Sequence, residues 1–423
     1  MQTEKPRLFP ETKHFIWVTL FFLGVILARL SIEYYTYQNF ISKPFYYTHA
    51  NVLAAYEKTK GKQRYQVLKL RSDEGFTFYT THYRKEDLAH TRLRLQIFPD
   101  NRIGFTDYLG TFYVKSRIKH KEPLPKTFKD DLLKKVASQH RDGSLGSFYN
   151  AIFFATSLDK ALREKISLLG VSHLVALSGF HLGILWGLVY GLLLLFYRPL
   201  QQRFFPYRHA LFDVGLAAMI LLGTYVWFVD FPPSLVRSYA MVLVGWTVLL
   251  LGMELLSFTF LATVVLLLVA LFPSLLVSLG FGLSVAGVFY IFLLLQYGKG
   301  VKTWIISLLF IPLGIFMLML PIVHAVFGVT SPYQLLSPLL SLLFVPFYPL
   351  AMGLHLVGFG DLLDTALSAL FALPQSSTES LVPIWGMVGY AGLSIGAIWS
   401  KKLFWSTLGT ASLYMVYLFV LVE

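Results

Sequence analysis

The side chains of this chain that could do chemistry gather in an otherwise apolar stretch, residues 171–187, which reads VSHLVALSGFHLGILWG. A membrane interior holds no water to solvate an imidazole or a hydroxyl, so such groups must face protein, a cavity or a substrate. Drawn as one helix, the stretch puts His173, Ser178 and His181 on one arc. A small-residue seam for close helix packing follows along the same segment: Gly179, Gly183, Gly187 and Gly191. We therefore predict a polar site at the mouth of a membrane helix.

Imidazoles in such a place allow three interpretations. They can line a hydrated path, they can hydrogen-bond to a neighbouring backbone, or His173 or His181 can act as a general base on a lipid-linked substrate. The chain contains no cysteine, which excludes disulfides, thiolate metal sites and thiol catalysis. Paired acids and metal-ligand spacings are also missing from the sequence. We therefore expect neither an enzyme nor a bound cofactor or metal.

The elements that position these residues follow from hydropathy. The chain of 423 residues is 56% hydrophobic and 14% charged, and apolar runs follow one another from residue 171 to residue 422. The first run, residues 15–32, follows basic residues and predicts a retained anchor with a cytoplasmic N-terminus. Further spans are expected near residues 209–229, 234–251, 257–272, 275–297 and 303–327.

Residues 34–150 are different, because they are polar and hold 21 Lys and Arg against 11 Asp and Glu. Alternation of apolar and polar residues, with turn signals between the runs, predicts five strands at residues 51–58, 64–71, 76–83, 92–98 and 111–118. Five short strands fit a small OB-like barrel. By the charge pattern of the flanking loops this domain lies outside the cytoplasm.

Aromatic and basic residues alternate in this domain, as they do in proteins that stack single-stranded nucleic acid in a basic groove. The basic candidates are Arg84, Lys85, Arg92, Arg94, Arg102, Lys115 and Arg117. The aromatic residues among them are Phe76, Phe78, Tyr79, Tyr83, Phe105, Tyr108, Phe112 and Tyr113. Each aromatic residue can instead fill the barrel core, so fold and charge carry this prediction together.

Three later segments complete the plan. Residues 126–168 show helical periodicity, interrupted at Asp142-Gly143 and at Gly146, and are expected at the membrane interface. Residues 332–357 contain Pro338, Pro346 and Pro349 among apolar residues, and the charge pattern of the loops predicts that they form a broken or re-entrant segment beside a pathway. Residues 361–373 are too short to span and predict an interfacial helix.

We thus expect a polytopic α-helical membrane protein with an N-terminal anchor helix and an inserted, small OB-like β-barrel domain outside the cytoplasm. Its parts are residues 1–33 (N-terminus and anchor), 34–125 (basic β domain), 126–170 (amphipathic helices) and 171–423 (transmembrane domain).

Residues 161–185, ALREKISLLGVSHLVALSGFHLGIL, resemble the competence-protein (ComEC) family of DNA-uptake channels. Residues 233–237 (PSLVR), 272–284 (FPSLLVSLGFGLS) and 331–346 (SPYQLLSPLLSLLFVP) resemble three later family motifs in the same order. The chain departs from the family pattern at Gly282, Ser341 and Ser238, where the family has Gln, Asn and Ala. The family's metallo-β-lactamase-like domain with its histidine cluster is not seen before Glu423, so we expect a short form that binds no zinc and cuts no DNA.

The resemblance implies a channel that passes one DNA strand into the cytoplasm of a bacterium, across its cytoplasmic (inner) membrane. The candidate pathway residues are His173, Ser178, Gly179, His181, Arg237, Ser284 and Ser341. Because the sequence has no P-loop, a motor must act from outside the chain. The expected partners are single-stranded DNA, membrane lipid, a periplasmic DNA receptor, a cytoplasmic DNA-processing or motor protein, and further copies of the chain.

Two rival functions stay open on the residues alone. One is the integral-membrane enzyme on lipid-linked substrates described above, and the other is a small-solute transporter. Secondary transporters usually show inverted repeats with matched broken helices, and only one segment here looks broken. Both rivals predict that loss of the protein leaves DNA uptake unchanged.

Overall fold

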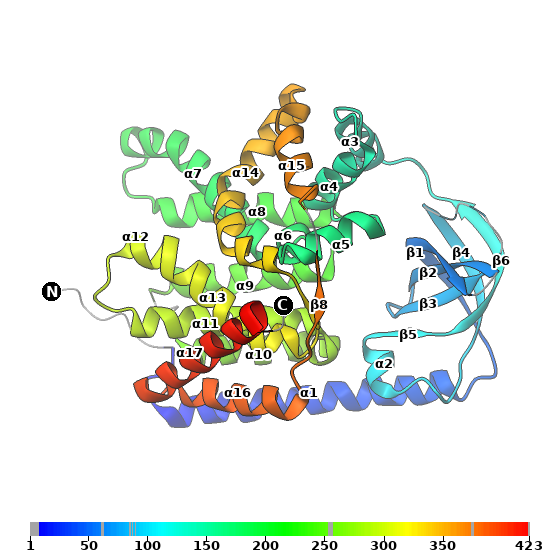
Figure 1. Ribbon diagram of the computed structural model, residues 1–423, viewed down its shortest axis with the longest axis horizontal. Helices are drawn as coiled ribbons and strands as arrows, with labels where there is room; N and C mark the ends of the chain where they lie inside the picture. The colour runs from blue at the N-terminus through cyan, green and yellow to red at the C-terminus, as the bar shows by residue number, and fades with distance from the viewer. Residues whose placement is uncertain are drawn as a thin grey trace. The chain divides into compact units, whose positions relative to one another are not determined.

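The apolar runs of the sequence form long helices, as Figure 1 shows for the computed structural model of the chain. The structure describes residues 8–60, 63–83, 86, 88, 90–252, 257–373 and 376–421. These residues form two compact units: a smaller one of residues 11–127 and 262–281, and a larger one that holds the others. The inclusion of residues 262–281 in the smaller unit is a tertiary feature that hydropathy does not reveal.

Eight described helices are long and apolar enough to cross a membrane, which confirms the prediction of a mainly helical chain with several membrane-length helices. Four are α1 (Thr12–Ile41), α7 (Gly179–Phe204), α8 (Ala210–Phe228) and α9 (Pro233–Leu250); a fifth is α11 (Leu279–Tyr297). The other three are composite: α12 (Thr303–Ile305), η2 (Ile306–Phe310) and α13 (Ile311–His324); η3 (Pro332–Leu336) and α14 (Ser337–Val357); and α17 (Lys401–Val416) with η5 (Tyr417–Leu421). Two apolar helices are shorter, α10 (Phe258–Leu271) and α16 (Ile384–Gly396).

In the smaller unit, all five predicted strands form. They are β1 (Tyr46–Lys60), β2 (Gln63–Ser72), β3 (Thr77–His82), β4 (Thr91–Phe98), and a last segment divided at Val114 into β5 (Thr111–Tyr113) and β6 (Lys115–Pro123). A short helix that the sequence did not reveal, α2 (Phe105–Leu109), lies between β4 and β5 and packs against η1 (Pro273–Val277).

The strands make one mixed sheet in the order β5-β3-β2-β1-β4-β6. All neighbouring strands are antiparallel except β3 and β5, which are parallel. The strand pairing thus shows a six-stranded sheet with β5 and β6 at its edges. It does not by itself establish the closed OB-like barrel that the sequence predicts.

The core of this unit lies on one face of the sheet. Leu93, Leu95 and Ile97 of β4 are fully buried, while Arg94 between them is exposed, as their alternation in the sequence predicts. The last turns of α1 extend beyond the predicted span and insert Phe40 into the same core. α1 and the sheet are therefore joined by packing as well as by the chain.

In the larger unit, residues 126–168 form three helices, α3 (Phe128–Ala137), α4 (Gly143–Phe154) and α5 (Lys160–Leu168). Asp142 caps α4 by accepting the N–H of Ser144 at 2.9 Å, and the hydrogen bonds from Ser144 lower the pKa of this carboxyl. The predicted interruption at Gly146 is wrong, because Gly146 lies inside α4 against Ala137. α4 also has eight buried residues out of 12, so it is part of the core of this unit.

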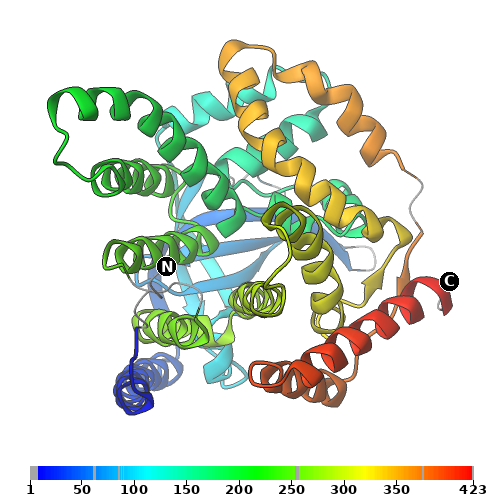
Figure 2. The same ribbon diagram turned by 90° about the vertical axis from the view of Figure 1, so that its left-hand side faces the viewer.

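The predicted broken segment at residues 332–357 needs a correction. Apart from the 3-10 turn η3, α14 is continuous from Ser337 to Val357 with Pro346 and Pro349 inside it. Each internal proline removes one backbone hydrogen bond, and packing of Phe344 and Tyr348 into the core holds the helix between them. Figure 2 shows α8, α9 and α11 nearly end-on, whereas α14 runs across the view, crosswise to them.

After α14 the chain turns through η4 (Gly360–Leu363) into α15 (Asp364–Phe371), in the place where the sequence predicts a short helix. A two-stranded ribbon, β7 (Val329–Thr330) with β8 (Thr378–Glu379), then links the segments before α14 and after α15. The buried residues of α11, α13, α16 and α17 form a cluster separate from the one around α4, α7 and α14.

Candidate functional site

The predicted site lies at a break between two helices. The single helix that placed His173, Ser178 and His181 on one arc does not form. Instead α6 (Ser172–Val175) ends, Ala176 is extended, and Ser178, also extended, begins α7 as its N-cap. The arc argument is therefore wrong, because extended backbone at Ala176 and Ser178 interrupts the 3.6-residue period on which it rests.

The break nevertheless brings Ser178 and His181 together. The backbone N–H of Ser178 donates to Nδ1 of His181 at 3.3 Å, and the Ser178 hydroxyl lies 3.4 Å from the same nitrogen. His181 thus satisfies a backbone donor at the start of α7, in the manner of a capping residue. Its ring is fully buried against Phe344 and Tyr348, and its Nε2 has no hydrogen-bond partner among the described residues.

The start of α9 packs against the same break. Ser234 donates to the carbonyl of Leu177 at 2.6 Å, which satisfies a group that the interrupted helix leaves without an intrahelical partner. A Cβ on Gly179 would lie only 2.9 Å from the hydroxyl oxygen of Ser238, so glycine permits this approach. Arg237 is half-buried on the same helix, between Ser234 and Ser238.

Only the first glycine of the predicted seam packs in this way. A Cβ on any of the other three would meet no described atom within 4 Å: Gly183, Gly187 and Gly191. These three glycines are exposed on α7. The seam prediction therefore holds for Gly179 alone within the described chain.

α14 closes the site from another side. His173 is exposed, and its Nε2 lies 3.3 Å from the hydroxyl oxygen of Ser341. Because Ser341 donates its only hydroxyl proton to the carbonyl of Ser337 at 2.7 Å, it can only accept from His173.

α14 also carries a polar stripe that sequence reasoning missed. Ser341, Tyr348 and His355 are seven residues apart and so lie on one face of the helix. Ser341 contacts His173, Tyr348 packs against His181, and His355 bonds to His140, so each residue of the stripe meets a histidine of another segment. The seven-residue spacing of polar residues in an apolar helix was the signal available.

Ser284 does not join this group. It is exposed on α11, whose buried residues Tyr290, Leu293 and Leu294 belong to the separate cluster with α13 and α16. The structure thus brings together His173, Ser178, Gly179, His181 and Ser341, places Arg237 beside them on α9, and leaves Ser284 in another part of the unit.

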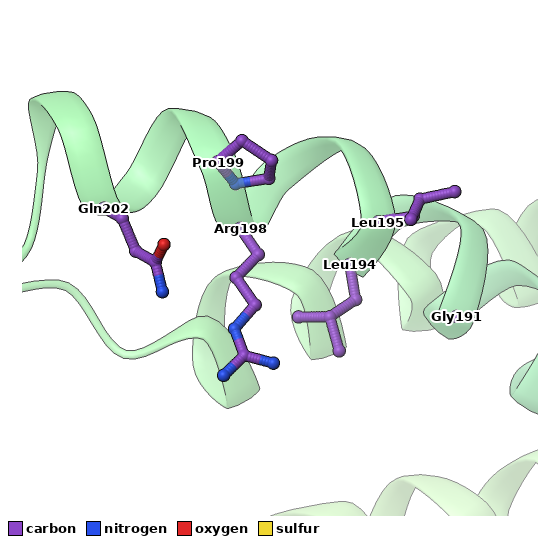
Figure 3. Close-up of a pocket in the computed structure, with 6 residues that line it drawn as sticks. All are labelled: Gly191, Leu194, Leu195, Arg198, Pro199 and Gln202. Atoms are coloured by element: carbon purple, nitrogen blue, oxygen red, sulfur yellow. The ribbon is translucent and has the colours of Figure 1, made fainter.

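A hollow of about 430 Å³ lies beside the C-terminal half of α7 (Figure 3). Its lining residues are Gly191, Leu194, Leu195, Arg198, Pro199 and Gln202. The side chains of Arg198 and Gln202 extend on one side of the helix, away from Pro199. None of the residues predicted to line a DNA path borders this hollow.

In the smaller unit, the outer face of β1, β4 and β6 carries exposed basic side chains beside aromatic rings. The guanidinium of Arg94 lies 6.0 Å from the ring centre of Tyr47, and that of Arg117 lies 5.5 Å from the ring centre of Phe98. The strand register aligns Tyr47 with Gln96 and Gln96 with Arg117 across this face. Tyr47 and Phe98 were not among the predicted aromatic residues.

Several predicted aromatic residues are core residues instead. Phe78 and Phe112 are buried, and Phe76 and Tyr108 pack against them around Phe40. Tyr83 and Tyr113 are exposed, and Tyr79 lies 5.9 Å from the amine of Lys69. Phe105 is half-buried against Tyr34 and Tyr37 of α1.

The predicted basic residues differ in the charges around them. Arg92 forms an ion pair with Asp73, and Arg102 lies 3.7 Å from a carboxylate oxygen of Asp100, so each has a nearby negative charge. Lys115 is exposed on β6 and is aligned with Phe98. Arg84 and Lys85 lie outside the described residues.

Taken together, the membrane-length helices and the basic sheet define a multi-pass membrane protein with a strand-rich domain. A family model described as Competence protein matches residues 154–423, well over half of the chain. The chain belongs to the competence protein family, which associates it with DNA uptake at a general level. No curated protein and no solved structure is detectably similar to it.

Proposed function

We propose that this protein is a channel, and not an enzyme, that passes one DNA strand into the cytoplasm during natural transformation. The observation that carries the proposal is the family match over residues 154–423, which includes the histidine site between α6, α7, α9 and α14. A polyanion crosses hydrocarbon only beside hydrogen-bonding or cationic groups, and this site gathers such groups within a membrane domain.

His181 is enclosed by aromatic rings in this structure, whereas His173 is exposed. The proposal therefore requires α14 to move relative to the start of α7 before a nucleotide can reach His181. His173 and Ser341 are the groups that a strand would meet first.

We propose further that the basic sheet is an OB-like barrel that binds single-stranded DNA outside the cytoplasm. The edge strands β5 and β6 are joined by Val114, whose N–H donates to the carbonyl of Tyr79 at 2.9 Å. The hydroxyls of Thr80 and Ser116 lie 2.8 Å apart, which brings β6 close to β3 as well. The exposed Arg94 and Arg117 beside aromatic rings supply the charge and stacking surfaces that single strands need.

The expected surroundings follow from this role. The protein would span the bacterial inner membrane, receive DNA from a periplasmic receptor, and pass it to a cytoplasmic DNA-processing or motor protein. Oligomerisation would let several copies surround one path.

Deletion of the gene tests the main proposal. Labelled DNA should still accumulate in the periplasm but should no longer enter the cytoplasm, and the chain expressed from a plasmid should restore entry. Cytoplasmic entry at the wild-type level in the deletion strain would overturn the proposal in favour of a role unrelated to DNA.

A further inference from the structure

A second polar cluster lies at the other end of α14 and belongs to no function discussed so far. Nδ1 of His140, in the turn between α3 and α4, lies 2.9 and 3.0 Å from the two carboxylate oxygens of Asp364 on α15. Nε2 of His140 lies 2.9 Å from Nε2 of His355. Nδ1 of His355 lies 2.7 Å from the carbonyl oxygen of Ala351. Asp364, His140 and His355 thus form one continuous hydrogen-bonded chain.

The hydrogen-bonded cluster of Asp364, His140 and His355 is shielded from water. The His140 side chain is fully buried and that of Asp364 is 18% exposed. The ring of Tyr149 stacks on His140, with ring centres 4.6 Å apart, and lies 4.4 Å from the ring centre of His355. At this degree of burial, two facing groups that both donate or both accept are costly.

The hydrogen-bond donors and acceptors of this cluster determine how many protons it holds. The carbonyl of Ala351 can only accept, so Nδ1 of His355 carries a proton. A second proton must lie between the two Nε2 atoms, on either one. A third proton must lie between Nδ1 of His140 and Asp364, on either atom. The closed chain therefore holds three protons and is electrically neutral overall.

We propose that Asp364, His140 and His355 form a buried proton-binding latch that holds the α3–α4 turn against the ends of α14 and α15 and opens when a proton is lost or gained. Loss of one proton sets the two Nε2 lone pairs against each other. Gain of a fourth proton on an imidazole sets the two Nε2–H donors against each other, and gain on Asp364 leaves a buried positive charge without its counter-charge, so either is costly. The latch is closed only in the pH range where it holds three protons.

The surrounding charges leave this count unchanged. Tyr149 is the titratable group of α4 that faces the pair, and burial together with Asp364 raises the pKa of its hydroxyl, which stays protonated. The other charged residues at the ends of these elements that are near the latch are exposed: Lys134, Lys135, Arg141, Asp142 and Asp361. Among the described residues, no group of three His, Asp or Glu side chains has an arrangement that could hold a metal ion. We therefore assign a proton, and not a metal ion, to this cluster.

Closure of the latch has a mechanical consequence. Gln139 donates to the carbonyl of His355 at 3.1 Å and accepts the N–H of Gly360 at 2.9 Å. The residue before His140 therefore binds the backbone on both sides of the turn between α14 and η4. A Cβ on Gly360 would lie 2.6 Å from the Gln139 side-chain oxygen, which leaves no room for a larger residue. Since α14 also carries Ser341 and Tyr348, the latch acts on the helix that contacts His173 and His181.

The test is hydrogen exchange of the α3–α4 turn in the purified full-length protein at about pH 5, 7 and 9, corrected for the intrinsic rate at each pH. Exchange at residues 138–142 should be slowest near neutral pH and about tenfold faster at both extremes. His324 is the internal control, because its Nε2 lies 3.0 Å from the Thr330 hydroxyl, which can reverse donor and acceptor roles. Exchange that does not vary with pH, or that varies equally around His324, would overturn the latch.

Asp364→Asn separates proton counting from simple removal of a hydrogen bond. The asparagine amide donates its own N–H to Nδ1 of His140, so the chain closes without a proton that can be lost. Opening at alkaline pH should disappear while opening at acid pH remains. His355→Gln offers a group that can donate or accept and should remove both. If either variant behaves like the wild type, the proposal is wrong.

Discussion

At the scale of single residues, the two histidines of the candidate site have different tasks. His181 is buried, and its Nδ1 accepts the Ser178 N–H at the start of α7, so it supports the local backbone. His173 is exposed, and its contact with Ser341 is long at 3.3 Å, so we expect the fold to depend on it less than on His181. An exposed imidazole among apolar residues is the one that a strand or its hydration water can reach.

We therefore expect His173→Leu to reduce cytoplasmic entry of DNA about tenfold, the effect of losing one hydrogen bond to a passing strand, while leaving the melting temperature and the amount of protein in the membrane unchanged. The measurement pairs an uptake assay with thermal unfolding of the purified protein. His209→Leu is the matched control, since His209 is an exposed histidine in the loop before α8 and its variant should take up DNA normally. Normal uptake by the His173 variant would return this residue to a structural role.

At the scale of elements, periodicity decides which side chains share a surface. The period of two along β4 turns Arg94 outward between Leu93 and Leu95, and the register with β6 sets Arg117 on the same face. Arg92 follows the same period but has Asp73 beside it, which reduces its attraction for a phosphate.

The double variant Arg94→Ala/Arg117→Ala of the full-length protein should bind single-stranded DNA more weakly. The slope of log affinity against log salt should fall by about 0.7 for each phosphate that the protein no longer neutralises. The control Arg92→Ala/Arg102→Ala removes the same formal charge, but from two arginines that have acidic neighbours. It should therefore weaken DNA binding less. Equal weakening in both double variants would indicate general charge attraction in place of a defined face.

At the scale of the whole molecule, the charge pattern of the loops predicts which segments lie on each side of the membrane. The basic sheet is expected outside the cytoplasm. The end of α7 with Arg198 and Arg203, the loop after it with Arg208, and the loop with Lys299 and Lys302 are expected inside. The chain itself has no cysteine, so any introduced thiol is the only one present.

A membrane-impermeant thiol reagent should label Lys119→Cys on exposed β6 in intact spheroplasts. It should label Lys299→Cys only after the membrane is permeabilised. Both positions are exposed in the structure, so reactivity reports the side of the membrane and not burial. Labelling of both positions in intact spheroplasts would contradict the proposed topology.

The sequence alone determined features that depend on local periodicity and hydropathy. These are the apolar spans, the five strand segments, the alternation of Leu93, Arg94 and Leu95, and the family motifs around Ser172, His173 and Ser178. Each is encoded within a few neighbouring residues, because a helix or a strand buries one face at a fixed period.

Only the tertiary structure decided where interrupted elements meet. The extended backbone before α7 makes a projection of residues 171–187 as one helix incorrect. Pro346 and Pro349 lie inside the continuous helix α14, whose residues Phe344 and Tyr348 pack into the core. His140 lies 215 residues before His355 and 224 before Asp364 in the sequence, so no local pattern unites the three. Such contacts depend on how separate helices pack, and that information lies in the whole chain together.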